Sequence, residues 1–429
     1  MKKLLLLVHM MVLPLTLVAC DNGGDVDPQP AESGSTEQTN GDSGEFGGES
    51  IVLWIDEPAY GEALEEALSL KFPDSNFEFQ EVNSTDALDM MRLDGPAGLA
   101  GDIMIIPHTN LVEGVQEMLF LPFSPDLEAR INSDFAPNTV ESIKVDENYF
   151  AIPLAIETIA MFYNKTLLEE HDLTVAESFE EIIEQAAVFN DPTNDDFILR
   201  WDVSDSYFDT IFLTAFGYEL FGPNHDDADL INFDTPEVLA GLEFYLSLRD
   251  ILPVEAADLD WSNTFGEFMA GNVPYHLSGR WAVAELSVQD DFEWGAVVIP
   301  TIGGERPLPF AGNQVAVASS FTDHPELVRE VLDFMMSDEG LQLAYDHRGS
   351  VAPLLDTSKI AGLDEDPGSL ALLEQANNHA MPMPAIPELS HFWPAADQMF
   401  ESVWNGLLTP QEAVDNAMEQ FEISRTLVE

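Results

Sequence analysis

The sequence predicts an α/β protein of two lobes, and three observations support this prediction. Short apolar runs typical of buried strands alternate with segments whose apolar residues recur at helical spacing. The chain has 429 residues, well above the roughly 150 residues of a single domain. Its hydrophobic share of 45% is enough to bury a sizeable core.

Strand-like runs open the folded part and recur along the chain. The first, Ile51–Ile55, ends before Asp56 and Pro58, and Gly101–Pro107 has the same buried character. Further strands are expected at 77–82, 149–152, 159–163, 294–299 and 314–318. Because strands that alternate with helices pair in parallel, we expect a mostly parallel sheet covered on both faces.

Helices are expected where apolar residues return every three or four positions. The first runs from Gly61 to Phe72 and stops at Pro73. The others are expected at 179–189, 236–248, 325–336 and 411–421. After the first twenty residues we expect no segment that crosses a membrane.

The first twenty residues have the character of a secretory signal. Lys2 and Lys3 precede the apolar stretch Leu4–Val18, which is too short for a comfortable membrane span. Residues 17–20 (LVAC) resemble the bacterial lipobox, in which cleavage exposes a cysteine that receives lipid. We therefore predict a signal peptide over 1–19 and lipidation of Cys20, in preference to a buried cysteine. Since this is the only cysteine, no disulfide is expected.

Residues 20–50 are expected to be the lipidated cysteine and a flexible acidic tether. The segment is rich in Gly, Ser, Pro and acidic residues, and its single aromatic residue is Phe46. Asp21, directly after the cysteine, resembles a signal for retention at the inner membrane of bacteria with two membranes. We expect an extracytoplasmic protein anchored to the cell membrane by lipid, on the periplasmic face of the inner membrane where there are two membranes.

The charge of the chain excludes several kinds of partner. With 79 acidic and 15 basic residues, the net charge is −64. Such an excess repels phosphates and anionic headgroups, so we expect no nucleic-acid partner and no binding to an anionic lipid surface. Repulsion among the carboxylates weakens as salt shortens the Debye length from about 10 Å at 0.1 M to about 3 Å at 1 M. This leads to the hypothesis of a halophilic acidic surface exposed to salty water.

Seven motifs stand in an order that is found in a known family. They are IVLWID from residue 51, GDIMIIPH from 101, AIPLAIETIAMFYNK from 151, FMAGNVPYHLSGRW from 268, FAGNQVAVASS from 310, MSDEGL from 336 and MPAIPELSHFWPAADQMF from 383. Together they resemble the extracellular solute-binding proteins of ABC importers, of the maltose/maltodextrin-binding type (bacterial family 1 sugar-binding lipoproteins). The resemblance covers nearly the whole chain after residue 51.

The resemblance implies a periplasmic-binding-protein-like fold with a ligand cleft between two discontinuous lobes. By the match, the chain crosses between the lobes near Ala151–Thr158 and near Leu308–Gly312. Closure on the solute is a hinge motion, and the closed form is what the membrane permease recognises. We expect a monomer that delivers a carbohydrate to this permease and is not an enzyme. The expected first lobe is 51–155 with 311–338, and the expected second lobe is 156–310 with 339–429.

A sugar site needs aromatic plates for apolar ring faces and planar acceptors for pairs of hydroxyls. The resemblance places ligand contacts at Asp56, His108, Asn110, Glu157, Asp205, Tyr207, Trp281 and Trp393. The first three follow strands, at the carboxyl ends where open α/β sheets bind ligands. Other interpretations stay open: a structural loop histidine at 108, a hinge-bracing acid at 157, a helix N-cap at 205 and core packing for the tryptophans.

Arg280 stands before Trp281, where the family has a small or cyclic residue. It either neutralises Glu157 or Asp205 across the cleft, which we favour, or grips an acidic sugar through a bidentate pair. Basic residues of the maltose-binding type are missing, for example where Asn110 stands. We therefore expect a neutral mono- or oligosaccharide without specifying maltose.

No phosphate-binding loop, metalloprotease motif, nucleophile elbow or Cys/His metal spacing occurs in the sequence. We expect no catalytic residue, no metal and no cofactor. The acidic run Asp226–Asp229 is expected to be a solvated loop, because the spacing and glycine of an EF-hand are missing. The alternatives are a polyol or acidic sugar in the same fold, a chemoreceptor co-ligand, or a surface glycosidase with Glu157 and Asp205 as acid and base.

Overall fold

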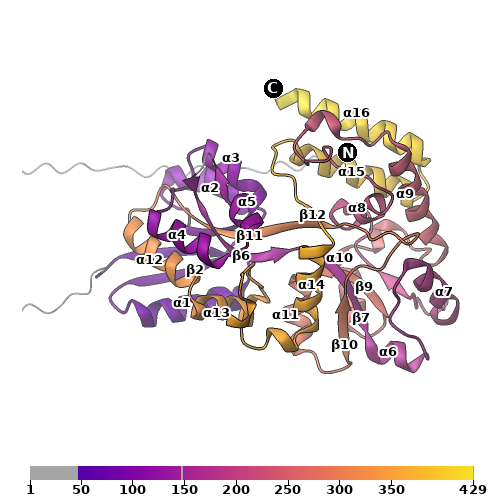
Figure 1. Ribbon diagram of the computed structural model, residues 1–429, viewed down its shortest axis with the longest axis horizontal. Coiled ribbons are helices and arrows are strands. Elements are labelled where there is room, and N and C mark those ends of the chain that lie inside the picture. Colours follow the sequence, from indigo (N-terminus) through magenta and orange to yellow (C-terminus); the bar gives the residue numbers. More distant parts are fainter. Residues whose placement is uncertain (1–46, 146–147, 429) are drawn as a thin grey trace, which may run out of the picture. The chain divides into compact units, whose positions relative to one another are not determined.

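The computed structural model describes residues 47–145 and 148–428. The predicted signal peptide, Cys20 and all but the last residues of the expected tether lie outside the described residues. The described residues belong to one compact unit, in which two α/β lobes are joined by strands that run between them (Figure 1). In the described part of the chain, every helix is too short or too polar to span a membrane.

The first lobe is built on a six-stranded sheet. Strands β1 (Ser50–Ile55), β2 (Asn76–Glu81) and β3 (Ile103–Pro107) are parallel, with β1 between the other two. Strand β11 (Phe310–Ala318) lies antiparallel to β3, and β6 (Ala151–Glu157) is antiparallel to β11 on its other side. The sheet therefore joins distant parts of the sequence. Strand β6 coincides with the crossing expected near 151–158, and β11 begins within the crossing expected near 308–312.

Helices cover this sheet, and their apolar faces form one core with it. Helix α1 begins with Pro58, whose fixed φ and missing N–H suit the first turn. The short strands β4 (Lys144–Val145) and β5 (Asn148–Tyr149) pair with each other, and β12 (Met381–Pro382) pairs with the start of β11. The helices of this lobe are α1 (Pro58–Lys71), α2 (Ala87–Asp94), α3 (Leu111–Gln116), α4 (Pro125–Asp134), α5 (Pro137–Ser142), α12 (Pro325–Met335) and α13 (Asp338–Arg348).

The second lobe has a four-stranded sheet in the order β10-β7-β9-β8. Its strands are β7 (Ile159–Asn164), β8 (Leu199–Arg200), β9 (Tyr275–Gly279) and β10 (Trp294–Val297). Only the pair β8–β9 is parallel, so the expectation of a mostly parallel sheet is wrong for this lobe. The reason is that strand-to-helix alternation along the chain does not fix which strands become neighbours.

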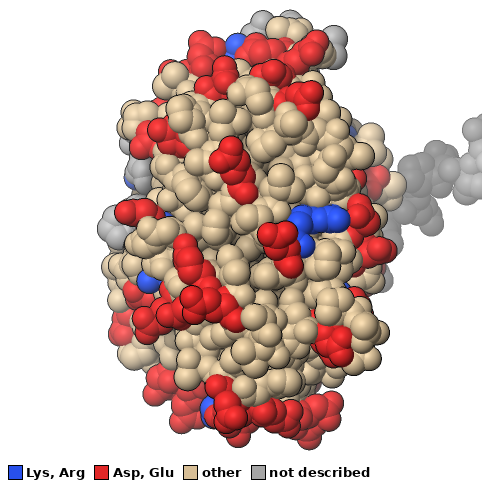
Figure 2. Space-filling model, turned by 90° about the vertical axis from the view of Figure 1, so that its right-hand side faces the viewer, with Lys and Arg blue, Asp and Glu red and all other residues tan. Residues whose placement is uncertain are grey.

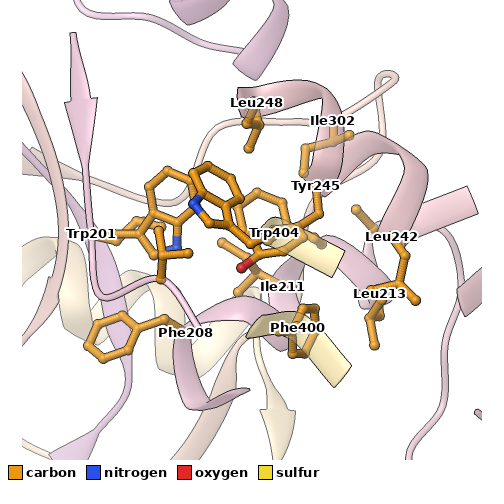
Figure 3. Close-up of a cluster of buried hydrophobic side chains, with 14 of the residues drawn as sticks. Trp201, Phe208, Ile211, Leu213, Leu242, Tyr245, Leu248, Ile302, Phe400 and Trp404 are labelled. Carbon is orange, nitrogen blue, oxygen red and sulfur yellow. The ribbon is translucent and has the colours of Figure 1, made fainter. Parts of the chain in front are cut away.

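A dense aromatic core holds the helices of the second lobe together. The rings of Trp201 and Trp404 lie 5.5 Å apart at an angle of 80°, and Tyr245 lies 5.1 Å from Trp404 (Figure 3). The helices of this lobe are α6 (Lys165–Glu170), α7 (Phe179–Phe189), α8 (Ser206–Thr214), α9 (Pro236–Ser247), α10 (Trp261–Met269), α11 (Trp281–Val288), α14 (Pro367–Asn378), α15 (Leu389–Trp404) and α16 (Pro410–Val428).

The lobe boundary expected after residue 338 differs from the observed cores. Leu341 of α13 and Leu363 pack in the core of the first lobe, whereas Ala371 of α14 packs with Phe162 in the second. Only Met336 and Ser337 separate α12 from α13, too few residues for the chain to cross to the other lobe. The chain therefore crosses a third time, between residues 363 and 371.

Acidic side chains are spread over the surface. Figure 2 shows them scattered over one face and gathered at its upper and lower edges, with few basic side chains among them. Among the residues whose exposure is described, Asp209 is the one carboxylate in the fully buried class. Nearly all of the described acidic residues are therefore hydrated to some degree.

Candidate functional site

A cavity of about 510 Å³ lies where the two lobes meet, within the range of about 300–1,000 Å³ typical of small-molecule sites. The first lobe contributes the turn after β3 and the start of α3. The crossing strands contribute Glu157 and Gln314, and the second lobe contributes the starts of α8 and α15. Polar and aromatic groups from three parts of the fold thus converge on one space.

A larger hollow of about 710 Å³ lies between α1 and α13. Its walls are the outer faces of helices from one lobe only, including Leu70 and His347. We place the functional site in the interlobe cavity because convergent polar groups from two lobes are what a binding site requires.

Five of the eight expected ligand contacts line this cavity. Asn110 ends the 3-10 turn His108–Asn110 after β3, and Glu157 is the last residue of β6. The other three come from the second lobe and are Asp205, Tyr207 and Trp393. The structure brings these five together from four separate segments of the chain.

Glu157 is held from two sides. Its Oε1 accepts a hydrogen bond from Nε of Arg280 at 3.1 Å, and its Oε2 accepts one from Nε2 of Gln314 at 2.6 Å. Arg280 is buried, and its Nη2 also lies 3.6 Å from Oδ2 of Asp56. Of the two interpretations of Arg280, the structure shows the pairing with Glu157.

Asp56 lies outside the cavity lining, in an ion pair behind it. Its Oδ1 accepts from Nε of Arg348 at 2.9 Å and its Oδ2 from Nη2 at 2.6 Å. Burial by itself raises the pKa of this carboxyl, but the Arg348 guanidinium and, more weakly, Arg280 lower it to about 2. Asp56 is therefore ionised and fully engaged by protein groups in this structure.

His108 and Trp281 also lie outside the cavity lining. His108 is buried, its Nδ1 accepts the N–H of Asn313 at 3.2 Å, and burial lowers its pKa to about 4, so its ring is neutral. Trp281 begins α11 and lies behind the cavity wall, with its ring 6.2 Å from those of both Tyr207 and Phe208. Trp281 therefore packs against Tyr207, which lines the cavity, whereas His108 bonds the backbone of β11.

The start of α8 carries two carboxylates into the cavity wall. Asp205 is the N-cap of α8, and its Oδ1 accepts the N–H of Tyr207 at 2.9 Å. Asp397 of α15 lines the cavity too, and its Oδ1 accepts the N–H of Ser206 at 2.9 Å and its hydroxyl at 2.5 Å. Burial, with the neighbouring Asp397 charge added, raises the pKa of Asp205 to about 6. The N-cap interpretation of Asp205 and its place in the cavity are both shown.

One buried ring fixes the aromatic wall of the cavity. Phe310, at the start of β11, stacks on Tyr207 with ring centres 6.1 Å apart and a 22° angle. The edge of Trp393 meets the same Phe310 ring at 5.4 Å and 72°. Tyr207 and Trp393 are therefore positioned by a shared neighbour and not by direct contact with each other.

The sequence reasoning missed several residues that line the cavity. Gln314 is buried in β11, and Met383 and Ile386 come from the segment before α15. All three lie within the motifs of the family, but apolar side chains such as Met383 and Ile386 do not indicate a sugar site. The one available signal was a polar Gln314 at the head of an apolar strand.

Across residues 47–145 and 148–428, there is no group of three or more His, Cys, Asp or Glu placed to hold a metal ion. In the acidic run at 226–229, Oδ1 of Asp227 accepts the N–H of Asp229 at 3.1 Å. Asp229 forms an ion pair with Arg425 at 2.8 Å. The run is therefore a surface turn with its own partners.

Two α/β lobes, crossing strands and a polar and aromatic cavity between the lobes define a two-lobed solute-binding protein. Residues 54–342 match the family described as bacterial extracellular solute-binding protein, so the chain belongs to this family. The resemblance and the fold class inferred from the motifs are confirmed.

Three similar proteins illustrate this membership. The maltodextrin-binding protein MdxE of Bacillus subtilis is 25% identical over 381 residues, covering 86% of this chain and 89% of that protein. The maltooligosaccharide ABC transporter solute-binding lipoprotein of Streptococcus pneumoniae (strain R6) is 24% identical over 415 residues, covering 94% and 92%. The structure of the maltose-maltodextrin binding protein of Alicyclobacillus acidocaldarius has a TM-score of 0.75 at 20% identity, covering 87% of this chain and all of that one.

Proposed function

We propose that this protein is the substrate-binding component of an ABC importer, which holds a carbohydrate in the interlobe cavity and delivers it to the membrane permease. The observation that carries the proposal is the composition of the cavity. Tyr207 and Trp393 form an aromatic wall, and Glu157, Asp205 and Gln314 supply planar acceptors. Aromatic faces and planar acceptors complement the apolar faces and hydroxyls of a sugar. The relatives described above support the same class of solute, because one is named a maltodextrin-binding protein and another a solute-binding lipoprotein of a maltooligosaccharide ABC transporter.

Ligand contact is proposed for Asn110, Glu157, Asp205, Tyr207 and Trp393. Asp56, His108 and Trp281, which were also expected to touch the ligand, are assigned supporting positions because they do not line the cavity. We propose that ligand affinity stabilises the arrangement in which both lobes contact the sugar, and that this arrangement is the form that the permease binds.

The anchor and the absence of catalysis belong to the same proposal. Lipidation of Cys20 after removal of residues 1–19 would hold the protein at the outer side of the cell membrane, and the pneumococcal relative, which is named a lipoprotein, supports this proposal. Both carboxylate oxygens of Glu157 accept hydrogen bonds from Arg280 and Gln314. This arrangement favours binding over the proton transfer that a glycosidase needs.

The test is a binding panel on the purified chain. Maltotriose, galactooligosaccharide, sorbitol and glucuronate are compared by calorimetry and by thermal shift at high salt. We expect one carbohydrate class to bind with a Kd near or below micromolar, about −8 kcal/mol or better, and to raise Tm. The proposal would be refuted if none of these ligands binds and if the amino sugars tested below also fail to bind. Release of reducing ends that is lost in a Glu157→Gln variant would support the glycosidase instead.

A further inference from the structure

The charge balance of the cavity is uneven. Four carboxylates line it, those of Glu113, Glu157, Asp205 and Asp397, and none of its described lining residues is Lys, Arg or His. Two of the four have cationic partners that approach from outside the lining. Glu157 pairs with Arg280 at 3.1 Å, and Glu113 pairs with Arg92 at 2.5 Å. The net charge of the cavity therefore depends on the two remaining carboxylates, those of Asp205 and Asp397.

Asp205 and Asp397 have only neutral partners among the described residues. Oδ1 of Asp205 accepts a hydrogen bond from the N–H of Tyr207. Oδ1 of Asp397 accepts hydrogen bonds from the N–H and the hydroxyl of Ser206, and both donor residues lie in the first turn of α8. No hydrogen bond or ion pair to Oδ2 of either carboxylate is found within residues 47–145 and 148–428. Each carboxylate thus keeps one oxygen available for a ligand.

A separate observation also indicates a missing donor. Gln314 is 3% exposed and lines the cavity, and its Nε2 is used by Glu157 at 2.6 Å. Its Oε1 is buried and has no hydrogen-bond partner in the described structure. Buried acceptors are normally satisfied, so this oxygen is an exception next to the cavity. Two carboxylate oxygens and one amide oxygen in residues that line the cavity therefore have no donor among the described residues.

We propose that the ligand is an amino sugar, or an oligosaccharide that contains one, bound through its ammonium group to the carboxylates of Asp205 and Asp397. An ammonium group supplies three donors and no acceptor, and it brings the positive charge that the cavity lacks. This inference rests on the proposed function, and it replaces the neutral sugar expected from the resemblance. An acidic sugar is disfavoured, because the arginines next to the lining are already paired. Arg280 pairs with Glu157 and Asp56, and Arg92 pairs with Glu113.

The test compares ligands that differ only in charge. Glucosamine is titrated against N-acetylglucosamine and glucose, and glucosamine oligomers against their fully N-acetylated forms and maltotriose, by calorimetry at pH 7. We expect at least one amino form to bind roughly tenfold or more tightly than its N-acetylated counterpart. Equal or tighter binding of the neutral forms would overturn the inference. If maltotriose binds and no amino form does, the inference fails while the proposed function stands. If nothing binds, both fail.

Variants that remove the charge but keep the shape locate the effect. Asp205→Asn and Asp397→Asn retain an acceptor for the α8 N–H groups, so both are expected to fold, which a thermal scan checks. Each should reduce the ratio of amino-form to N-acetyl affinity by about tenfold. The matched control is Glu243→Gln on the exposed face of α9, which removes the same charge far from the lining residues and should leave the ratio unchanged. A ratio that is unaffected by both cavity variants would contradict the assignment, whatever ligand is bound.

Discussion

Two groups of carboxylates in this protein meet opposite electrostatic surroundings. Asp56, at the end of β1, is buried against the guanidinium groups of Arg348 and Arg280, which outweigh its burial and lower its pKa to about 2. Asp205, at the start of α8, has no cationic partner among the described residues. There, burial and the nearby charge of Asp397 raise the pKa to about 6. The pKa of an aspartate is thus lowered in one part of the molecule and raised in another.

The contrast between Asp56 and Asp205 shows where a chain with few basic residues places its buried arginines. Only 15 basic residues are available to 79 acidic ones. Arg280 and Arg348 are both buried, and without them Asp56 and Glu157 would be left as largely buried charges with no cationic partner. The carboxylates on the opposite side of the cavity receive only backbone and hydroxyl donors. The carboxylates at the crossing strands are thus paired with arginines, whereas Asp205 and Asp397 at the starts of α8 and α15 have no cationic partner among the described residues.

The largest loss of stability is expected from removing the ion pair between Arg348 and Asp56. Arg348→Met leaves Asp56 buried without its bidentate partner, which should cost about 3–5 kcal/mol in the free energy of unfolding. Denaturant unfolding at fixed high salt measures it. The matched control is Arg329→Met on α12, whose pair with Glu326 is exposed and should contribute less than about 1 kcal/mol. Equal losses in the two variants would mean that burial does not distinguish these ion pairs.

A smaller effect is expected from removing the aromatic wall of the cavity. Trp393→Ala should weaken carbohydrate binding by about 2 kcal/mol, roughly 30-fold in Kd, because it deletes a ring that lines the cavity. Calorimetry with the best ligand of the panel measures this loss. Trp294→Ala in β10 removes a partly buried ring outside the cavity and should lower Tm without changing Kd. A Kd that is insensitive to Trp393 would place the sugar elsewhere.

The contributions of Asp205 and Asp56 to the free energy of unfolding should change with pH in opposite directions. The pKa of Asp205 is raised in the folded state, so its stabilising contribution is present below about pH 4 and is lost as pH rises through about 6. The pKa of Asp56 is lowered, so its contribution is present above about pH 4 and is lost as pH falls through about 2. Asp202, with a pKa that burial and the Asp205 charge raise to about 7, reinforces the first trend, as does Asp397.

Two substitutions separate these contributions. Asp205→Asn cannot ionise and keeps the helix cap, so relative to the wild type it should gain about 1 kcal/mol of stability between pH 4 and 7, after allowance for partial exposure. Asp56→Asn should be less stable than the wild type above about pH 4, and this difference should shrink as pH falls through about 2. Unfolding free energies measured at several pH values give both slopes. A Asp205→Asn curve that runs parallel to that of the wild type would show that Asp205 is not the group that titrates.

The smallest effect is expected for single exposed carboxylates. Glu243→Gln should raise stability by less than about 0.5 kcal/mol at 0.1 M salt, and the gain should vanish near 1 M as the Debye length falls to about 3 Å. The wild-type Tm measured over the same salt series tests the hypothesis of a halophilic surface. A Tm that does not rise with salt would show that the repulsion among the surface carboxylates is already screened or balanced at low salt.

Local patterns in the sequence predicted many of the elements. The helix expected at 179–189 has the same bounds as α7, and β1 differs by one residue from the expected strand. Such segments are specified by their own periodicity and by nearby caps, such as Ser178 before α7. The antiparallel sheet of the second lobe and the place of α13 could not be predicted in this way, because both depend on which distant segments become neighbours.

In the candidate site, too, some residues could be predicted from local sequence motifs, whereas others depend on contacts between distant segments. Glu157, Asp205 and Trp393 were found because motifs of the family mark them. The partner of Asp56 was not found, since Arg348 lies 292 positions away in the sequence and no pattern links the two residues. The two residues meet only because α13 remains on the first lobe, which is the placement that the expected boundary missed. Pairings that tertiary packing creates are visible only in the folded chain.

The strand β11 has a consequence for how this site can diversify. Phe310 supports Tyr207 and Trp393, while Gln314, four residues further along the same strand, pairs with Glu157. One inserted or deleted residue between them would turn one of the two side chains to the other face of the sheet. Evolution of a new ligand preference must therefore keep the length of this segment and substitute side chains on α8 and α15. Among homologues, gaps in an alignment should avoid residues 310–314 even where ligand specificities differ.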